Sequence, residues 1–375
     1  MMITSLCLSP FVLAKTRKTY LTDFMLDHQI KDEGFTNSER EDYREDSDDV
    51  SYQATAYALE LLADYALLEE KDIFGKETAS YNSSDLQEEL EDVLSAKYNA
   101  GPLDLFDTYY ILKALNGMDY EISGTLALQI TSYLASIAQS GGGFSGSPQV
   151  TTSDLASTYF AIIIYDLLDL AVPNLLAHYA FTLSCGNPDG GFGGEPGGPS
   201  TIASAYFAVL IAEYLEDIRV MPYPDLTVDY LNSFYVDDEN DEDNYGGYLP
   251  DLNAENAHIC STYFCIKAIS IIDELIDEEE FEDKDATSEW VLTKQNFQDG
   301  GFVDISDGYE QRYSSVVNTY YAHEILDILG RTELLEEKVF MMEFETIDWV
   351  IFVIILVSLV ALAVIGIIIW RKRKV

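Results

Sequence analysis

From Asp189 to Tyr214 the sequence reads DGGFGGEPGGPSTIASAYFAVLIAEY. The paired glycines before Phe192 suit a turn, because glycine adopts left-handed backbone angles without strain. The run that follows begins with small polar residues, which cap helix N-termini, and continues with apolar residues at nearly every position. This stretch therefore predicts a Gly-Gly-aromatic turn that leads into a buried helix.

A small residue followed by tyrosine within an apolar run recurs six times along the chain. The six tyrosines are Tyr57, Tyr109, Tyr159, Tyr206, Tyr263 and Tyr320. Their spacings are 52, 50, 47, 57 and 57 residues. A unit of this length is too long for tetratricopeptide or ankyrin repeats and fits one helical hairpin with its loops.

Two other features repeat with the same period. A glycine turn that ends in an aromatic precedes five of the six copies, at Phe35, Phe144, Phe192, Tyr248 and Phe302. Amphipathic helical runs lie between the apolar ones and begin near Thr19, Leu86, Leu126, Asn174, Leu226 and Ser288. An inner helix of a double ring is covered on most sides, whereas an outer helix faces water on one side. The expected fold is all-α, with one (α/α)6 toroid of six helical hairpins over residues 15–345.

The chain is strongly acidic. Its 375 residues include 66 Asp and Glu against 21 Lys and Arg, for a formal net charge of -45. Such a surface repels polyanions, so nucleic acid is excluded as a partner. The four cysteines form no Cys-x-x-Cys pair, which argues against a zinc ribbon or a dense disulfide framework.

The ends of the chain indicate a membrane protein. The run from Trp349 to Trp370 is uncharged, and about 20 apolar residues span a bilayer core. We expect a transmembrane helix over residues 346–370 and a basic cytoplasmic tail over residues 371–375. Residues 1–14 are apolar and end in Val12-x-Ala14, so they are a candidate signal peptide. This topology places the toroid outside the cytoplasm, in a single-pass protein of the cell membrane.

The Gly-Gly-Phe turns that lead into helices beginning with Ser or Thr and an aromatic resemble the protein prenyltransferase β-subunit and terpenoid cyclase superfamily. The resemblance covers about residues 20 to 330 and implies an α/α toroid. It specifies the fold more than the function.

In prenyltransferase β-subunits an Asp-x-Cys pair and a histidine hold zinc. The corresponding place in the fourth copy carries Ile202-Ala203-Ser204, which offers no such pair. The substitute candidates for a zinc site are His258 and Cys260 in the fifth copy, with Asp251 or His323 as a third ligand. The alternative is that His258 begins a helix and Cys260 is buried.

The resemblance to class II terpenoid cyclases implies an Asp-x-Asp-Asp acid motif. Asp46-Ser47-Asp48-Asp49 matches it, so Asp46, Asp48 and Asp49 are candidate catalytic residues. The match lies a few residues before Gln53, where the register of the repeat places the acid, and within an acid-rich loop. A solvated loop is therefore the competing interpretation.

The acidic segment Asp237–Asp243 is a candidate Ca²⁺ site, because carboxylates are the ligands that calcium prefers. It lacks the spacing of an EF-hand loop. A solvated acidic loop is the alternative.

Two functions from different classes remain. In the first, the toroid is a binding module or pseudoenzyme, and the six tyrosines line a central cavity that holds a hydrophobic chain or a peptide. The alternative is a divergent isoprenoid enzyme of the prenyltransferase or terpenoid cyclase type. The tyrosines could also form core between the inner helices, and a glycan-active toroid with paired carboxylates is a third hypothesis.

Overall fold

The structure is a computed structural model, which describes residues 15–30, 33–38, 50–68, 83–101, 105–215, 221, 223–276, 281–296, 298–304, 314–339 and 358. The predicted signal peptide and the basic tail lie outside these residues. So does the predicted membrane helix, apart from Ser358.

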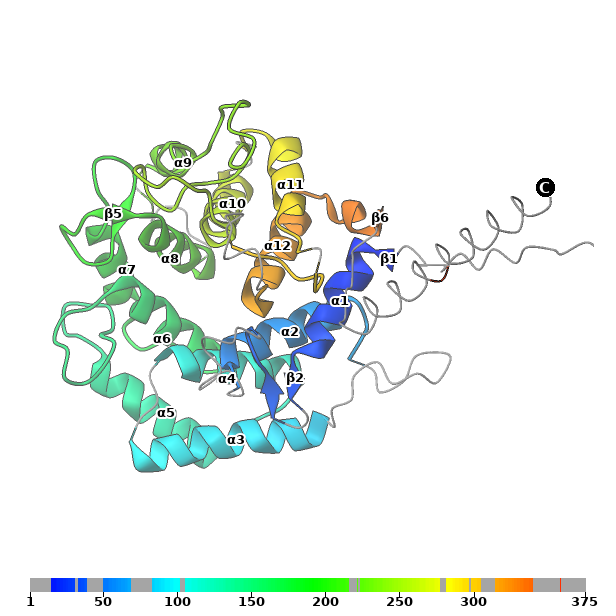
Figure 1. The fold of residues 1–375 in the computed structure, drawn as a ribbon. Helices are drawn as coiled ribbons and strands as arrows, with labels where there is room; N and C mark the ends of the chain where they lie inside the picture. Colours follow the sequence, from blue (N-terminus) through cyan, green and yellow to red (C-terminus); the bar gives the residue numbers. More distant parts are fainter. Residues whose placement is uncertain are drawn as a thin grey trace, which may run out of the picture.

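Six inner helices form a closed ring. They are α2 (Tyr52–Asp64), α4 (Leu105–Gly117), α6 (Leu155–Leu167), α8 (Ile202–Tyr214), α10 (Ile259–Ile276) and α12 (Val316–Ile328). Each packs against the next in chain order, and α12 packs back against α2, as the order around the ring in Figure 1 shows. The predicted toroid is therefore confirmed.

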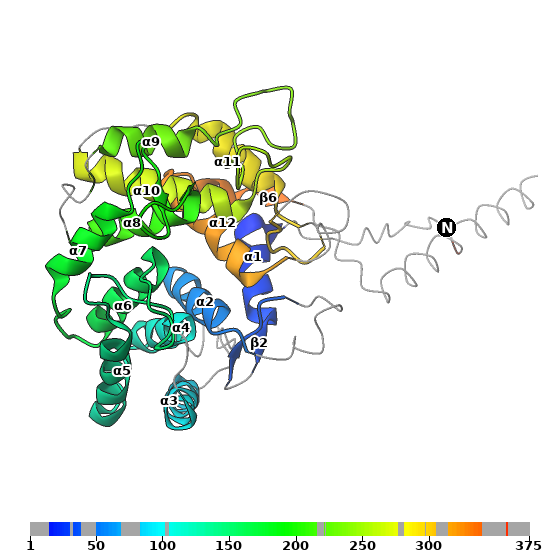
Figure 2. The same cartoon turned by 90° about the vertical axis from the view of Figure 1, so that its left-hand side faces the viewer.

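Six outer helices surround this ring. They are α1 (Arg17–Asp27), α3 (Ser83–Ala100), α5 (Gly124–Ile137), α7 (Leu175–Ser184), α9 (Pro224–Asn232) and α11 (Lys284–Thr293). Figure 2 shows α3 and α5 on the outside of α4 and α6. The inner helix α8 has buried residues on all sides, whereas α3 alternates buried leucines with exposed polar residues. This contrast is the one that the amphipathic and apolar runs predicted.

Small polar residues cap the inner helices. Ser51, Asp154, Thr201 and Ser315 are the N-cap residues of α2, α6, α8 and α12, and each side-chain oxygen accepts a hydrogen bond from the backbone N–H three residues later. Such a cap stabilises a helix by about 1 kcal/mol. The polar residues that precede each apolar run thus define where the helix begins.

A second polar residue, four positions after the N-cap, joins four of the turns to their inner helices. The backbone N–H of the turn aromatic donates to a threonine Oγ1 at 2.9 to 3.0 Å in the pairs Phe35–Thr55, Phe144–Thr158, Tyr248–Thr262 and Phe302–Thr319. Each threonine hydroxyl donates in turn to the carbonyl of the residue four positions earlier. All four aromatics are buried, so this hydroxyl satisfies an N–H that water cannot reach.

The paired glycines seat each turn on the next outer helix. The first glycine of the pair has a positive φ at Gly142, Gly190 and Gly246, and a Cβ there would lie 2.1, 2.0 and 2.4 Å from a backbone oxygen of α7, α9 and α11. At Gly300 the nearest such neighbours belong to Tyr20 in α1, at 2.8 Å. The last turn therefore packs on the first outer helix and closes the outer ring.

The glycines lie beyond the ends of the outer helices. Helix α7 ends at Ser184, several residues before Gly190. The left-handed angles are used where the chain must pass close to a neighbouring backbone, which is a tertiary requirement.

Short strands fasten the ends of the toroid. Strand β1 (Lys15–Thr16) pairs with β6 (Lys338–Val339), which follows the 3₁₀ helix η4 (Thr332–Glu336). Two further pairs, β2 (Gln29–Ile30) with β3 (Gly34–Phe35) and β4 (Phe192–Gly193) with β5 (Ser200–Thr201), lie within loops at the turns.

Within the described parts of the chain, no helix combines the length and the apolar character that crossing a bilayer requires.

Candidate binding site on the toroid axis

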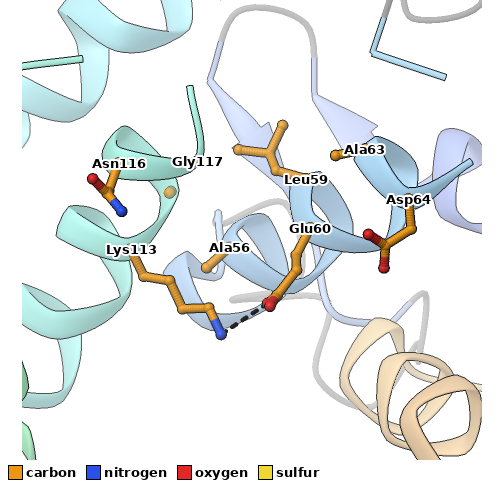
Figure 3. A pocket seen from close by; sticks show the side chains of 9 residues that line it. Ala56, Leu59, Glu60, Ala63, Asp64, Lys113, Asn116 and Gly117 are labelled. Atoms are coloured by element: carbon orange, nitrogen blue, oxygen red, sulfur yellow. Dashed lines mark ion pairs between the residues drawn. The ribbon is translucent and has the colours of Figure 1, made fainter. Parts of the chain in front are cut away.

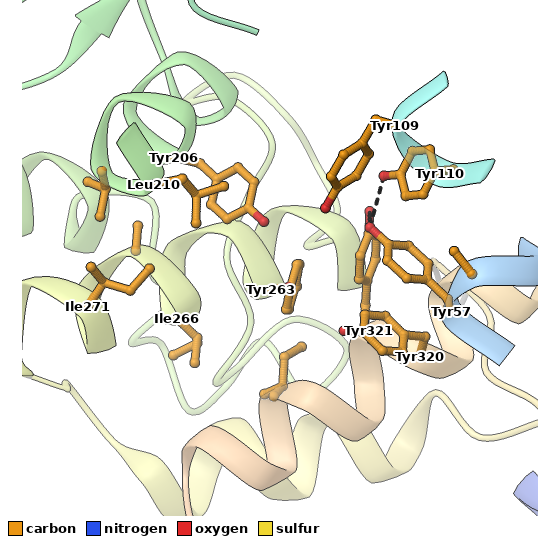
Figure 4. Packing of buried hydrophobic residues seen from close by; sticks show 14 of the residues in the cluster. Tyr57, Tyr109, Tyr110, Tyr206, Leu210, Tyr263, Ile266, Ile271, Tyr320 and Tyr321 are labelled. Atoms are coloured by element: carbon orange, nitrogen blue, oxygen red, sulfur yellow. Dashed lines mark hydrogen bonds between the residues drawn. The ribbon is translucent and has the colours of Figure 1, made fainter. Parts of the chain in front are cut away.

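The six repeated tyrosines meet at the axis of the inner ring (Figure 4 labels five of them). Ring-to-ring contacts lead around the axis from helix to helix, as the centroid distances of Tyr109–Tyr159 (6.2 Å), Tyr206–Tyr263 (6.1 Å), Tyr263–Tyr320 (6.5 Å) and Tyr320–Tyr57 (4.0 Å) show. The repeat register thus translates into one aromatic cluster, because every inner helix presents the same position to the axis.

A second aromatic follows the tyrosine in five copies. These residues are Tyr110, Phe160, Phe207, Phe264 and Tyr321, and they complete the circuit, for example through Tyr159–Phe207 (5.6 Å), Tyr206–Phe264 (4.4 Å) and Tyr263–Tyr321 (4.4 Å). The sequence carries this signal as tyrosine-aromatic pairs, which our list of single tyrosines left out. We call these eleven side chains the axial cluster.

Most of the axial cluster is packed against itself. Of the six repeated tyrosines, Tyr159 is half-buried and the others are buried. Burial, followed by the neighbouring phenols of Tyr321 and Tyr110, raises the pKa of Tyr57 well above its usual range. At this level of the axis the tyrosines therefore pack as core between the inner helices.

Hydroxyl and amide groups form a polar patch inside the axial cluster. The Tyr57 and Tyr110 hydroxyls lie 2.9 Å apart, and the Gln53 amide donates to the hydroxyls of Tyr110 at 3.0 Å and Tyr321 at 3.4 Å. Gln53 lies one turn before Tyr57 on α2, so both project toward the axis. These groups are uncharged and suit a neutral polar group of a ligand better than a diphosphate.

Aromatic surface is accessible where the inner helices begin. Phe106, in the first turn of α4, is 41% exposed and contacts Phe160 with a centroid distance of 5.8 Å. Phe160 is half-buried and contacts the half-buried Phe207 at 5.6 Å. These three rings, which we call the aromatic mouth, form apolar surface continuous with the axial cluster.

The other end of α2 and α4 is charged. Lys113 Nζ lies 2.8 Å from Glu60 Oε2, and the ammonium is 5.2 Å from the centroid of the Tyr57 ring, beneath the axial cluster. Burial disfavours the charge of Lys113, but Tyr109 and Glu60 outweigh it, so the pKa of Lys113 is raised. A cavity of about 250 Å³ opens here, lined by Glu60, Lys113, Asp64 and Asn116 among others (Figure 3).

The residues predicted for zinc are not gathered into one group. His258 Nδ1 lies 3.1 Å from Asp304 Oδ2, and hydrogen bonding to Asp304 raises the pKa of His258 despite its burial. Burial raises the pKa of the Cys260 thiol to about 12, which keeps it protonated at neutral pH. The Asp251 carboxylate accepts the backbone N–H of Asn253.

His323 belongs to a different group. In the described residues one set of three metal-ligating side chains converges, and it consists of Asp64, His323 and Glu324. Spacing along the chain could not identify it, because Asp64 and His323 come from opposite ends of the toroid sequence. The candidate acid residues Asp46, Asp48 and Asp49 lie outside the described residues.

The acidic segment Asp237–Asp243 is occupied by internal hydrogen bonds. The Asp238 carboxylate accepts from the backbone and side chain of Asn240, and the Asp241 carboxylate accepts from Asn244. The backbone carbonyl of Asp243 accepts from Lys294. These contacts engage the Asp238 and Asp241 carboxylates, and the carboxylates of this segment are not part of the converging group found among the described residues.

The profile of the family "Prenyltransferase alpha-alpha toroid domain" matches residues 86–338. No curated protein matches the chain.

Solved structures are similar in fold. Candida albicans protein geranylgeranyltransferase-I complexed with GGPP has a TM-score of 0.55 and 15% identity, over 79% of this chain and 89% of that chain. A type II terpene cyclase from Scytonema has a TM-score of 0.51 and 12% identity, over 85% and 97%. An α-1,6-mannanase from Salegentibacter has a TM-score of 0.50 and 14% identity, over 85% and 98%. At these identities the likeness extends to the fold alone.

Proposed function

Because the chain belongs to the prenyltransferase α/α toroid domain family, we propose that it is a binding module that holds a hydrophobic chain at the aromatic mouth of its toroid. The ligand class is an isoprenoid or a similarly apolar chain with a neutral polar end. A hydrophobic peptide is the alternative ligand.

The observation that carries the proposal is the apolar surface at the start of the inner helices. Phe106, Phe160 and Phe207 are accessible and continuous with the buried axial cluster. Aromatic rings contribute large apolar area at a defined geometry, which is what binding an apolar chain uses. The Gln53 and Tyr110 groups lie next to these rings and could hydrogen-bond an alcohol or carbonyl oxygen.

A divergent isoprenoid enzyme is the second candidate. It is favoured by the family and by the similarity in fold to a protein geranylgeranyltransferase and a terpene cyclase. Lys113, whose ammonium lies 5.2 Å from the centroid of the Tyr57 ring, is however already paired with Glu60. A diphosphate needs uncompensated cationic groups, so the geometry supports binding of an uncharged chain better.

Photo-crosslinking of the full chain in amphipol tests the binding proposal. A diazirine derivative of geranylgeraniol should label peptides around Phe160 and Phe207, and unlabelled geranylgeraniol should compete. Phe207→Asp should reduce labelling at least about tenfold, because a carboxylate on the apolar contact surface is costly to desolvate. The matched control is Leu176→Asp, which makes the same kind of change on the outer helix α7 at a side chain that is 82% exposed. Labelling that survives Phe207→Asp unchanged contradicts the proposal.

Incubation with geranylgeranyl diphosphate distinguishes an isoprenoid enzyme from a binding module. Release of diphosphate or formation of a cyclised product above the level of boiled protein would replace the binding module by the second candidate.

We also propose that residues 346–370 anchor the toroid in the cell membrane, with residues 371–375 in the cytoplasm and the toroid outside. The uncharged run from Trp349 to Trp370 and the basic residues after it support this topology. An epitope placed after Val375 should become accessible to antibody only when the cells are permeabilised, whereas staining of intact cells would reverse the orientation.

A further inference from the structure

A histidine and two carboxylates converge where the ring of inner helices closes. Asp64 is the last residue of α2, and His323 and Glu324 lie on α12. One ligand atom from each of the three residues lies within 4.8 Å of the others. We propose that Asp64, His323 and Glu324 form a binding site for a first-row divalent cation such as Zn²⁺ or Mn²⁺.

The donor set suits such an ion. One imidazole nitrogen with two carboxylates is a combination used by zinc, manganese and iron, whereas Ca²⁺ and Mg²⁺ prefer all-oxygen sites. Three protein ligands leave room for water to complete the coordination. The charge also fits, because Asp64 is surrounded by the carboxylates of Glu324, Glu60 and Asp327.

Several like charges act on Asp64. The carboxylates of Glu324, Glu60 and Asp327 repel its charge, and His323 opposes them. A divalent cation would relieve the repulsion between like charges at this place.

The imidazole of His323 is buried and fixed in place by its neighbours. Its side chain is 5% exposed, its Nδ1 lies 3.3 Å from Glu324 Oε1, and the ring of Tyr65 packs edge-on against it. The contact with Glu324 and the packing of Tyr65 hold the imidazole in one orientation beside the two carboxylates.

A cavity adjoins the site at Asp64, although His323 and Glu324 are not among the residues that line it. Asp64 and Glu60 line the cavity of about 250 Å³, which is large enough for several waters. Lys113 faces Glu60 at 2.8 Å, and this ion pair keeps Glu60 out of the proposed ligand set (Figure 3). This site lies where the inner helices end, away from the aromatic mouth where they begin, so it is independent of the proposed function.

Metal analysis of the full chain tests the site. Protein dialysed against Zn²⁺ in the presence of millimolar Mg²⁺, which occupies weak carboxylate sites on this acidic surface, should retain one equivalent of zinc. His323→Gln and Asp64→Asn should each weaken Zn²⁺ binding at least about tenfold. Asp64 is exposed, so Asp64→Asn leaves the fold intact even if His323→Gln does not.

The matched control is His258→Gln. His258 is also a histidine beside a carboxylate, Asp304, but among the residues that the structure describes no third ligand joins this pair. Zinc binding that survives Asp64→Asn, or that is lost equally in His258→Gln, overturns the proposal. So does wild-type protein that retains no zinc under these conditions.

Discussion

The two ends of the inner helices are stabilised differently. At the turn end, where the inner helices begin, tight backbone contacts hold the toroid together. At the charged end, where they finish, charged side chains interact. At the first end, glycines let the turns approach outer-helix carbonyls at distances that no Cβ could share, and threonine hydroxyls satisfy the buried N–H groups. At the second end, Glu60 pairs with Lys113, and Asp64, His323 and Glu324 converge beside a cavity. We therefore expect substitutions at the turn end to change the stability of the fold most, whereas the charged end contributes less to stability and can bind an ion.

The largest effect should come from the glycines of the turn end. Gly190→Ala places a Cβ 2.0 Å from the carbonyl oxygen of Leu226 on a residue with a φ of +88°. We expect the free energy of unfolding to fall by roughly 3 kcal/mol or more, from strain and steric overlap together. Urea denaturation followed by circular dichroism measures it.

The control lies in the same loop. Gly197 also has a positive φ, of +79°, but nothing lies within 4 Å of its Cβ position. Gly197→Ala should therefore cost about 1 kcal/mol from backbone strain alone. Equal losses in the two variants would show that the close approach to α9 is unimportant.

The second largest loss of stability should come from the threonines that accept the turn N–H groups. Thr158→Val removes the acceptor of the buried Phe144 N–H without changing the size of the side chain. An unsatisfied buried donor costs about 1–3 kcal/mol. Thr131→Val is the control, because the Thr131 hydroxyl contacts helix carbonyls alone, and it should change stability by less than about 0.5 kcal/mol. The fourth copy carries Ala205 at this place. Ala205→Thr therefore tests whether a threonine hydroxyl stabilises that copy as well.

The stability should depend on pH through a buried lysine at the turn end. Lys294 is 2% exposed and donates to the Asp243 carbonyl, and burial lowers its pKa to about 8. The unfolded chain keeps this proton up to a pH of about 10.4, so between these values it binds more protons than the folded chain. Stability should therefore rise, by about 1 kcal/mol between pH 8 and pH 9.

Denaturation curves at several pH values measure this rise, and Lys294→Met should abolish it. Above pH 10 the trend should reverse, because burial raises the pKa of Tyr57 and Tyr206 in the folded chain and unfolding would release their protons. A wild-type stability that falls steadily from pH 8 would contradict the assignment to Lys294.

The smallest effect is expected at the charged end. Glu60→Gln breaks the ion pair with Lys113, whose side chains are 41% and 24% exposed. Pairs this accessible to water contribute about 0–1 kcal/mol. The loss should therefore lie below 1 kcal/mol and shrink further in 0.5 M NaCl. A loss of stability as large as that of Gly190→Ala would contradict the view that the turn end contributes more to stability than the charged end.

Much of the architecture follows from local sequence. The period of the tyrosines, the glycine turns and the alternation of apolar and amphipathic runs predicted six hairpins in one toroid, and the structure has them between Arg17 and Ile328. These signals can be interpreted from sequence because helix periodicity, capping and turn conformation each depend on residues a few positions apart.

The site was less accessible to sequence analysis. The tyrosines were found, but whether they line a cavity or fill it depends on ring diameter and on the second aromatic of each pair, and the structure packs most of them together. His258 and Cys260 are close in sequence, but among the described residues they do not converge on a third ligand. His323 was predicted to join them and instead lies with Asp64 and Glu324.

The sequence by itself determined the repeat, the turns and the order of the helices, since each is encoded within about fifty residues. The tertiary structure alone decided which side chains meet across the closing seam. Asp64 lies on the first inner helix and His323 on the last, and they come together because α12 packs against α2 when the ring closes. Closure is a property of all six hairpins at once, so no local pattern could encode that meeting.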